Sequence, residues 1–334
     1  MTFSTFMVVG GAGFVGSHLV DALLKYDAEK VVVVDNMHLG TLENLYYALQ
    51  TNKVVIYRED ARYFSALENI IDREKPEVIF NLAVKCLPYG FVDPEGSFMT
   101  GVEIAQNLAN LLRKHKYRRL IHFSSSEAYG TAKIVPMSES HPLDPTTPYG
   151  AGKAAADLLL QSYHKLFNIG ISIIRPFNLY GPRQNMEAYA AVIPVTINRI
   201  LHSQKPIIEG DGLQTRDFSY VGDAVEAAIK LMNCKQAIGK VVNIGQNREY
   251  SIREVISTIC NELNYPQDQI EHAKARPSDV RRLFADVSLA KNLIAYAPQV
   301  SFSEGIKFTV EWFKARLRQP NVPCEVLKYA GVQF

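Results

Sequence analysis

The sequence contains little cysteine, no strong excess of charge and no long apolar run. Its 334 residues include only four cysteines, which are scattered as Cys86, Cys234, Cys260 and Cys324. Because no C-x-x-C pair occurs, we expect neither a disulfide framework nor a metal site. The net charge of +2 predicts no nucleic-acid partner. With no transmembrane run and no signal-peptide core in view, we expect a cytoplasmic protein without a membrane partner.

A glycine-rich segment follows a short apolar run near the start of the chain. The apolar run covers residues 6–9. The glycines and the first helical positions after them are Gly10, Gly13, Phe14, Val15 and Gly16. In this order of strand, glycines and helix, the backbone can approach a pyrophosphate closely, and the helix N-terminus supplies amide donors.

An acidic residue ends the second apolar run. That run covers residues 31–34, and Asp35 follows it, 19 residues after Gly16 (35 minus 16). A carboxylate at this place can accept hydrogen bonds from an adenosine ribose. The two segments together predict a dinucleotide site, and the free carboxylate favours NAD over NADP because it would repel a 2′-phosphate.

Apolar runs continue to alternate with helical patterns along the chain. Strands are expected at 6–9, 31–34, 54–57, 76–82, 120–124, 171–175 and 241–244. Helices are expected at 65–74, 97–116, 148–167 and 192–201. This alternation predicts an α/β fold with a Rossmann-type doubly wound parallel sheet.

A change of rhythm after Pro176 predicts a second, smaller domain. Proline and glycine become frequent there, and the pattern after Ser251 is mostly helical. We expect an NAD-binding domain of residues 1–178 with about 214–248. A mostly helical C-terminal substrate-binding domain would then comprise about 179–213 and 249–320.

A tyrosine and a lysine stand one helical turn apart near the middle of the chain. Thr147 followed by Pro148 is typical of an N-cap and first helical position, which puts Tyr149 in the first turn. Lys153 lies four residues later, on the same face. Its ammonium is expected to lower the pKa of the tyrosine from about 10, so that Tyr149 can move protons at neutral pH. The alternative is an ordinary helix start in which the two residues meet by chance.

Two serines and a glutamate follow the strand that precedes this helix. They are Ser125, Ser126 and Glu127. Open α/β sheets bind their ligands at the carboxyl ends of the strands. These side chains are therefore candidate active-site residues, together with Tyr149.

With these features the chain resembles the extended short-chain dehydrogenases/reductases, specifically the NAD-dependent nucleotide-sugar epimerases and dehydratases. The resemblance extends from residue 7 to about residue 313. The blocks that carry it are 10–18, Asp35–Asn36, Asp60, 81–83, 124–130, 149–153, 175–183, 216–223 and 276–281. It implies NAD as the cofactor and a nucleotide-diphosphate sugar as the substrate.

The resemblance also implies roles for individual residues. Tyr149 would take the proton of the sugar 4-hydroxyl, Lys153 would hold the nicotinamide ribose, and Ser125 would hydrogen-bond the 4-oxygen. The implied cofactor contacts beyond the glycines are Asp35, Asn36, Asp60, Ala61, Leu82 and Ala83, with Asp60 near the adenine. The candidate substrate contacts are Lys85, Cys86, Asn178, Arg183, Val192, Arg216, Arg276 and Arg281. The arginine fork suits a diphosphate, so Arg216 would bind it with Asn178 and either Arg276 or Arg281.

Several of these residues have simpler interpretations. Asp60 could cap the next helix, and Asn178 could be a turn residue. Arg216 could form a surface ion pair with a nearby aspartate. Cys86 could be a small buried residue.

Glu127 separates the reactions found in the family. Relatives that only epimerise C4 commonly carry no carboxylate here, whereas 4,6-dehydratases and UDP-glucuronate decarboxylases have a glutamate two residues after the Ser/Thr site. We therefore predict a 4,6-dehydratase in which Glu127 removes the C5 proton of a 4-keto intermediate. Ser126 stands where dTDP-glucose dehydratases have an acid, so Glu127 would have to serve as both base and acid.

The alternatives are a 4-epimerase, a decarboxylase, a 5,6-dehydratase and a regulatory protein that binds NAD without turnover. The presence of Ser125, Tyr149 and Lys153 argues against the last of these. The helices expected at 97–116 and 148–167 match those through which relatives pair, so a homodimer is expected. Packing within one chain is the alternative for their outer faces.

Overall fold

The computed structural model describes residues 3–186, 190–275 and 280–318, and its centre is a seven-stranded sheet. The strand order is β11-β6-β5-β4-β1-β2-β3, and every neighbouring pair is parallel. The strands of this sheet are β1 (Thr5–Val9), β2 (Lys30–Val34), β3 (Val54–Tyr57), β4 (Val78–Asn81), β5 (Arg119–Phe123), β6 (Ile171–Pro176) and β11 (Val241–Ile244). The predicted doubly wound parallel sheet is confirmed.

The carboxyl ends of the central strands meet at one edge of the sheet. Val9 at the end of β1 pairs with Val34 of β2 on one side and with Asn81 of β4 on the other. After β1 the chain builds β2 and β3 outward, then crosses back to place β4 on the opposite side of β1. Such a reversal opens a crevice at the strand ends, which is where doubly wound sheets bind ligands.

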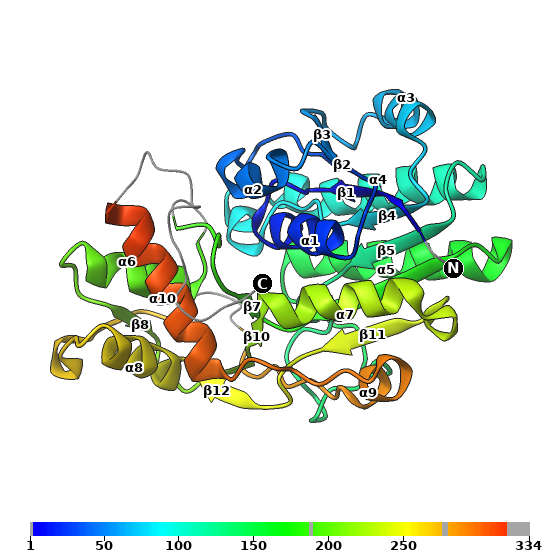
Figure 1. Cartoon of the computed structure of the whole chain (residues 1–334). Coiled ribbons are helices and arrows are strands. Elements are labelled where there is room, and N and C mark those ends of the chain that lie inside the picture. Colours follow the sequence, from blue (N-terminus) through cyan, green and yellow to red (C-terminus); the bar gives the residue numbers. More distant parts are fainter. Residues whose placement is uncertain (1–2, 187–189, 276–279, 319–334) are drawn as a thin grey trace.

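Helices cover both faces of the sheet (Figure 1). One face carries α1 (Phe14–Lys25), α2 (Tyr46–Leu49), α7 (Val221–Asn233) and α9 (Ser288–Ile294). The other face carries α3 (Phe64–Glu74), α4 (Pro94–Arg113) and α5 (Pro148–Phe167). Successive β1 residues alternate between the layers: Val8 packs with Leu19 of α1, and Met7 packs with Leu108 of α4. Strands buried on both faces are continuously apolar, as the sequence shows.

A third group of elements lies beside the carboxyl edge of the sheet (Figure 1). Its helices are α6 (Val192–Leu201), α8 (Ile252–Glu262) and α10 (Phe302–Arg318). The short strands in and next to this group are β7 (Leu179–Tyr180), β8 (Ile207–Glu209), β9 (Thr215–Asp217), β10 (Ser219–Tyr220), β12 (Glu249–Ser251) and β13 (Glu271–Ala273). A small apolar cluster joins β8 to α8 through Ile208, Ile256 and Cys260. No helix among the described residues is long and apolar enough to span a membrane.

The bounds of α4 differ from the expected 97–116. The helix begins at Pro94 because the Asp93 side chain accepts a hydrogen bond from the Gly96 amide at 2.8 Å, which makes Asp93 its N-cap. It ends at Arg113, and His115 beyond it has a left-handed backbone with a φ of +57°. The expected start is therefore wrong by about one turn, since the capping aspartate was not recognised.

Candidate active site

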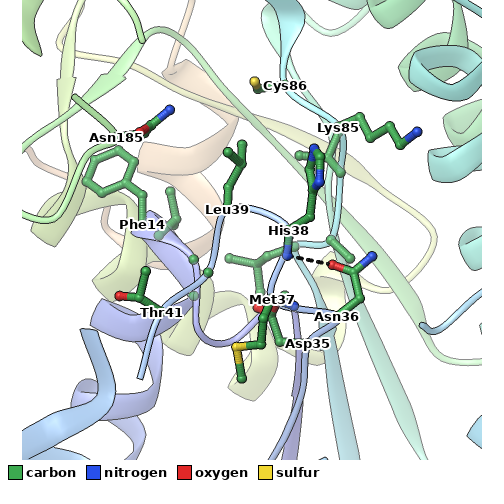
Figure 2. A pocket seen from close by; sticks show the side chains of 18 of the residues that line it. Phe14, Asp35, Asn36, Met37, His38, Leu39, Thr41, Lys85, Cys86 and Asn185 are labelled. Atoms are coloured by element: carbon green, nitrogen blue, oxygen red, sulfur yellow. Dashed lines mark hydrogen bonds between the residues drawn. The ribbon is translucent and has the colours of Figure 1, made fainter. Parts of the chain in front are cut away.

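A cavity of about 830 Å³ opens at the carboxyl ends of β1, β2 and β4 (Figure 2). The residues named as cofactor contacts from the sequence share a property: apart from Tyr149 and Lys153, each of them lines this cavity. They are Gly10, Gly13, Phe14, Val15, Gly16, Asp35, Asn36, Asp60, Ala61, Leu82 and Ala83. The structure thus brings into one place segments that are up to 73 residues apart in the sequence (83 minus 10).

The glycine turn forms the floor of the cavity. Gly10 has a φ of +81°, and a Cβ there would lie 2.7 Å from the Ala83 amide nitrogen. A Cβ on Gly16 would overlap the Gly10 carbonyl oxygen. The N-cap of α1 is Gly13, and no side chain caps this helix. Its first amide groups are available to an anion, so the turn fits the pyrophosphate of a dinucleotide.

Replacing Gly10 by alanine is expected to weaken NAD binding at least about tenfold. A non-glycine residue forced into left-handed backbone costs on the order of 1–3 kcal/mol, and the clash with Ala83 adds to it. Calorimetric titration of the purified variant with NAD measures the effect. Gly101→Ala in α4 is the matched control, because a Cβ there meets nothing within 4 Å. Equal NAD affinity in the two variants would contradict the assignment of the glycine turn.

Asp35 and Asn36 define the next part of the cavity. The Asp35 carboxylate accepts the amide N–H groups of Ala12 and Met37, each at 2.9 Å, and burial raises its pKa. Asn36 donates from its side-chain amide to Asp60 at 3.3 Å. The arrangement presents carboxylate oxygens where the sequence predicts the adenosine ribose.

Asp60 does not cap the following helix, so that alternative is wrong. The N-cap of α3 is Tyr63, while the Asp60 carboxylate holds the Arg62 guanidinium at 2.8 Å. Burial raises the pKa of Asp60, but the hydrogen bonds from Arg62 outweigh it and leave the pKa below its usual value. Asp60 and Arg62 both line the cavity. The family resemblance places Asp60 near the adenine of the cofactor.

The catalytic candidates meet between the end of β5 and the start of α5. Thr147 caps α5 by accepting the Gly150 amide at 3.1 Å, and Pro148 is the first helical residue, as predicted. Tyr149 is half-buried and shares a side-chain hydrogen bond with Ser125. The Lys153 ammonium lies 5.9 Å from the centre of the Tyr149 ring.

The pKa of Tyr149 differs from the expectation. Burial away from water raises this pKa, and the Glu127 charge raises it further. The hydrogen bond with Ser125 lowers it, but the pKa of Tyr149 still lies above its usual value. The expected lowering by Lys153 is wrong, because its ammonium donates to the Phe123 carbonyl at 2.7 Å. Helical spacing fixes the face on which a lysine lies, but not the group that its flexible side chain reaches.

Glu127 lies in a short turn that packs against the start of α5. Ser125 Oγ accepts the Glu127 amide at 3.2 Å and caps a 3₁₀ turn, Ser126–Ala128. Ser126 itself is buried. A Cβ on Gly150 would lie 2.5 Å from the Glu127 carbonyl oxygen, so glycine there permits the close approach of turn and helix. The turn thereby brings Glu127 near enough to Tyr149 for its charge to raise the tyrosine pKa.

Three of the candidate substrate contacts also line the cavity: Lys85, Cys86 and Arg183. The Lys85 ammonium pairs with Asp93 at 2.8 Å and lies over the Tyr89 ring. Figure 2 shows it extending away from Cys86. Cys86 is half-buried and lines the cavity, and burial raises the pKa of its thiol.

The other candidate substrate contacts lie outside this cavity. Asn178 has a buried side-chain oxygen with no hydrogen-bond partner among the described residues, and Val192 begins α6. Arg216 in β9 is buried, so a surface ion pair is the wrong description of it. Arg281 is exposed and pairs with Asp211 at 2.9 Å. Arg276 lies outside the described residues.

Sequence reasoning missed several residues that line the cavity. The loop after Asp35 contributes them in sequence order, namely Met37, His38, Leu39, Gly40 and Thr41 (Figure 2). Its position after the second strand is a signal that could have found it. Trp312 and Arg316 of α10 also line the cavity. Nothing local in their amphipathic helix points to a ligand.

Comparisons with known proteins identify the family of the chain. Residues 7–309 match the family described as GDP-mannose 4,6 dehydratase. The UDP-glucose 4-epimerase of Mycolicibacterium smegmatis is 36% identical over 310 residues, 92% of this chain and 98% of the relative. UDP-glucuronic acid decarboxylase 3 of Arabidopsis thaliana is 33% identical over 321 residues, 94% of this chain and 90% of the relative.

A solved structure is similar along the same length. It is DesIV from Streptomyces venezuelae, described as a dTDP-glucose 4,6-dehydratase with NAD and TYD bound. The TM-score is 0.89 at 26% identity, and the match covers 94% of this chain and 98% of that chain. Since the family match spans nearly the whole chain, the protein belongs to the GDP-mannose 4,6-dehydratase family of extended short-chain dehydrogenases/reductases and is an enzyme of the nucleotide-sugar dehydratase, epimerase and decarboxylase class.

Proposed function

We propose that the enzyme is a nucleotide-sugar 4,6-dehydratase. The observation that carries the proposal is the carboxylate of Glu127, which is close enough to Tyr149 to raise its pKa. A reaction that stops at oxidation and reduction of C4 needs the tyrosine and lysine alone. A reaction that eliminates water from C5 and C6 needs one more base, and Glu127 is our candidate for it.

The cofactor is NAD, as in DesIV. The glycine turn fits its pyrophosphate, and the buried carboxylate of Asp35 would repel the 2′-phosphate of NADP. When bound, NAD would accept a hydride from C4 of the sugar and return it to C6 after water has left, so that the overall reaction is loss of one water. Asn36, Asp60 and Arg62 would hold its adenosine end.

The catalytic residues divide the proton transfers among them. Tyr149 takes the proton of the 4-hydroxyl, and Ser125 donates a hydrogen bond to the 4-oxygen. Glu127 removes the C5 proton, which the adjacent 4-keto group acidifies. Because Ser126 carries no acidic proton, Glu127 also returns a proton to the leaving 6-hydroxyl. One carboxylate thus serves first as base and then as acid, and a proton that exchanges with solvent is added back to C5 when the hydride reaches C6.

The remaining substrate contacts come from the group of elements beside the sheet. Asn178 and the buried Arg216 would hold the diphosphate of the nucleotide sugar. Arg183, which lines the cofactor cavity, would contact the substrate from there. In this proposal residues 1–178 with about 214–248 bind NAD, and about 179–213 with 249–320 bind the nucleotide sugar. Exposed Leu158 and Leu166 on α5 support a homodimer through α4 and α5, which size-exclusion chromatography tests.

A 4-epimerase is the second candidate. It is favoured by the 36% identity to the Mycolicibacterium smegmatis UDP-glucose 4-epimerase, which exceeds the 33% identity to the decarboxylase. Such an enzyme would use Tyr149, Lys153 and Ser125 in the same way. It would leave Glu127 without a part in the chemistry.

Mass spectrometry of products tests the proposal. The purified enzyme is incubated with UDP-, dTDP-, GDP- and CDP-sugars in turn. The proposal expects a product that has lost one water from at least one of them. A product of unchanged mass would indicate the epimerase, and loss of carbon dioxide from a uronate would indicate a decarboxylase.

A further inference from the structure

The carboxylate of Asp157 is fully buried one helical turn after Lys153, on the same face of α5. Its Oδ2 accepts the Ser124 hydroxyl at 2.7 Å and both Nε and Nη2 of Arg175, with Nε at 3.1 Å. Its Oδ1 has no hydrogen-bond partner among the described residues, and His122 Nε2 lies 4.0 Å from it.

His122 adds no charge to this cluster. The amide nitrogen of Asn81, Nδ2, can only donate, so His122 Nδ1 accepts from it at 3.0 Å and the ring proton lies on Nε2, toward Asp157. Burial and the charges of Lys153 and Arg175 hold the pKa of His122 well below its usual range. The ring is therefore neutral.

The Asp157 carboxylate acts on two buried cations: it pairs directly with Arg175, and its charge acts on the pKa of Lys153. The titratable and charged groups around Lys153 are Tyr149 and Asp157 from α5, His122 from β5 and Arg175 from β6. Burial lowers the pKa of Lys153 to about 8, and Asp157 acts to raise it. Arg175 keeps its proton under all ordinary conditions, whereas a lysine loses its proton readily when buried. If the carboxylate is lost, Lys153 is the group that becomes neutral.

We propose that Asp157 is a positioning residue that keeps Lys153 protonated during the reaction, while the Phe123 carbonyl, which accepts from the ammonium at 2.7 Å, holds it in place. Ser124 and Arg175 fix the carboxylate in place, and the N–H of His122 faces its second oxygen. The inference deepens the proposed function, since it rests on a reaction in which Lys153 must be charged. Asp157 touches neither the cavity lining nor the reacting groups, so it acts through Lys153.

Asp157→Asn is expected to lower the pKa of Lys153 by at least about one unit, a tenfold change in its protonation equilibrium. A charged lysine is then present only at lower pH. The alkaline fall of kcat should move to lower pH, and kcat at pH 8 should drop at least about fivefold, because a pKa of about 8 leaves half of Lys153 charged there in the wild-type enzyme. The titration is followed in ¹³C-lysine-labelled protein by the Cε resonance of Lys153, assigned by its loss in Lys153→Met.

Destabilisation needs its own control, because Asp157→Asn leaves the Arg175 cation buried without a carboxylate. The double variant Asp157→Asn/Arg175→Met removes both charges at similar volume. We expect it to regain thermal stability relative to the single variant while Lys153 still titrates at low pH and kcat stays low. Asp157→Glu should restore the titration. Asp72→Asn, which removes an exposed partner of Lys116, should change neither property.

The outcomes separate a positioning role from a structural one. A Lys153 titration that is unchanged in both Asp157 variants would overturn the inference. So would a double variant that regains wild-type kcat together with stability. The resonance reports the lysine directly, so a shifted titration in an enzyme that turns over no nucleotide sugar would support the inference and count against the proposed function alone.

Discussion

Tyr149→Phe is expected to reduce turnover by a factor of about 10²–10⁴, because it removes the group that accepts the 4-hydroxyl proton. NAD affinity should stay close to that of the wild-type enzyme, since Tyr149 does not line the cofactor cavity. Initial rates with the accepted nucleotide sugar and a calorimetric titration with NAD measure the two effects. Loss of the hydroxyl removes only one atom, so the fold should be unaffected.

Tyr163→Phe provides the matched control on the same helix. The Tyr163 hydroxyl donates to the Asn110 side chain at 3.1 Å and has no part in the candidate site. Its removal should leave turnover unchanged. If Tyr149→Phe kept wild-type turnover, as Tyr163→Phe should, Tyr149 would not be the base. A wild-type preparation that turns over no nucleotide sugar would instead support the regulatory-protein alternative.

Glu127→Gln is expected to stop water elimination and to leave oxidation at C4 intact. The amide keeps the shape of the side chain and the backbone hydrogen bond to Ser125, but it accepts no proton. Rapid-mixing absorbance in the nicotinamide band should therefore show the first step, while mass spectrometry finds no dehydrated product. The expected loss of complete turnover is about 10²-fold or more.

Glu226→Gln is the comparison for this variant. Glu226 forms an exposed pair with Lys230 one turn along α7, at 2.6 Å, and its removal should leave the product unchanged. Full turnover in Glu127→Gln would contradict the dehydratase proposal. Because a 4-epimerase has no step that uses the glutamate, that result would favour the epimerase.

Much of the fold follows from patterns that are local in the sequence. The expected strands end within one residue of the observed ones, and Thr147 with Pro148 marks the start of α5 to the residue. The glycine turn and Asp35 are likewise recognisable, since their chemistry depends on residues close to them in the chain. These signals place the cofactor cavity without any knowledge of distant contacts.

Side-chain partners that are distant in the sequence could not be predicted in the same way. Lys85 lines the cavity, and its ammonium pairs with Asp93 at the start of α4, a partner that no pattern in the sequence indicates. Arg183 pairs with Asp21 of α1 at 2.7 Å, which tertiary packing alone decides. Trp312 lines the cavity because α10 packs beside it. The apolar periodicity of that helix indicates only which of its faces is buried.

The buried cluster around Asp157 shows the same limit. In the sequence this aspartate is one polar residue in an amphipathic helix. Only the approach of Arg175 from β6 and of Ser124 from the end of β5 reveals that it is an internal carboxylate paired with a buried cation. Helical periodicity indicates that Lys153 and Asp157 share a face of α5, but it indicates none of the other neighbours.

Solvent isotope incorporation tests the central claim most directly. The enzyme is incubated in deuterated water with the nucleotide sugar that it accepts, and the product is measured by mass spectrometry and NMR. If Glu127 removes the C5 proton during 4,6-elimination, the product has lost one water and carries solvent deuterium at C5. A product of unchanged composition with no deuterium on carbon and an inverted C4 centre would contradict the account and identify a 4-epimerase.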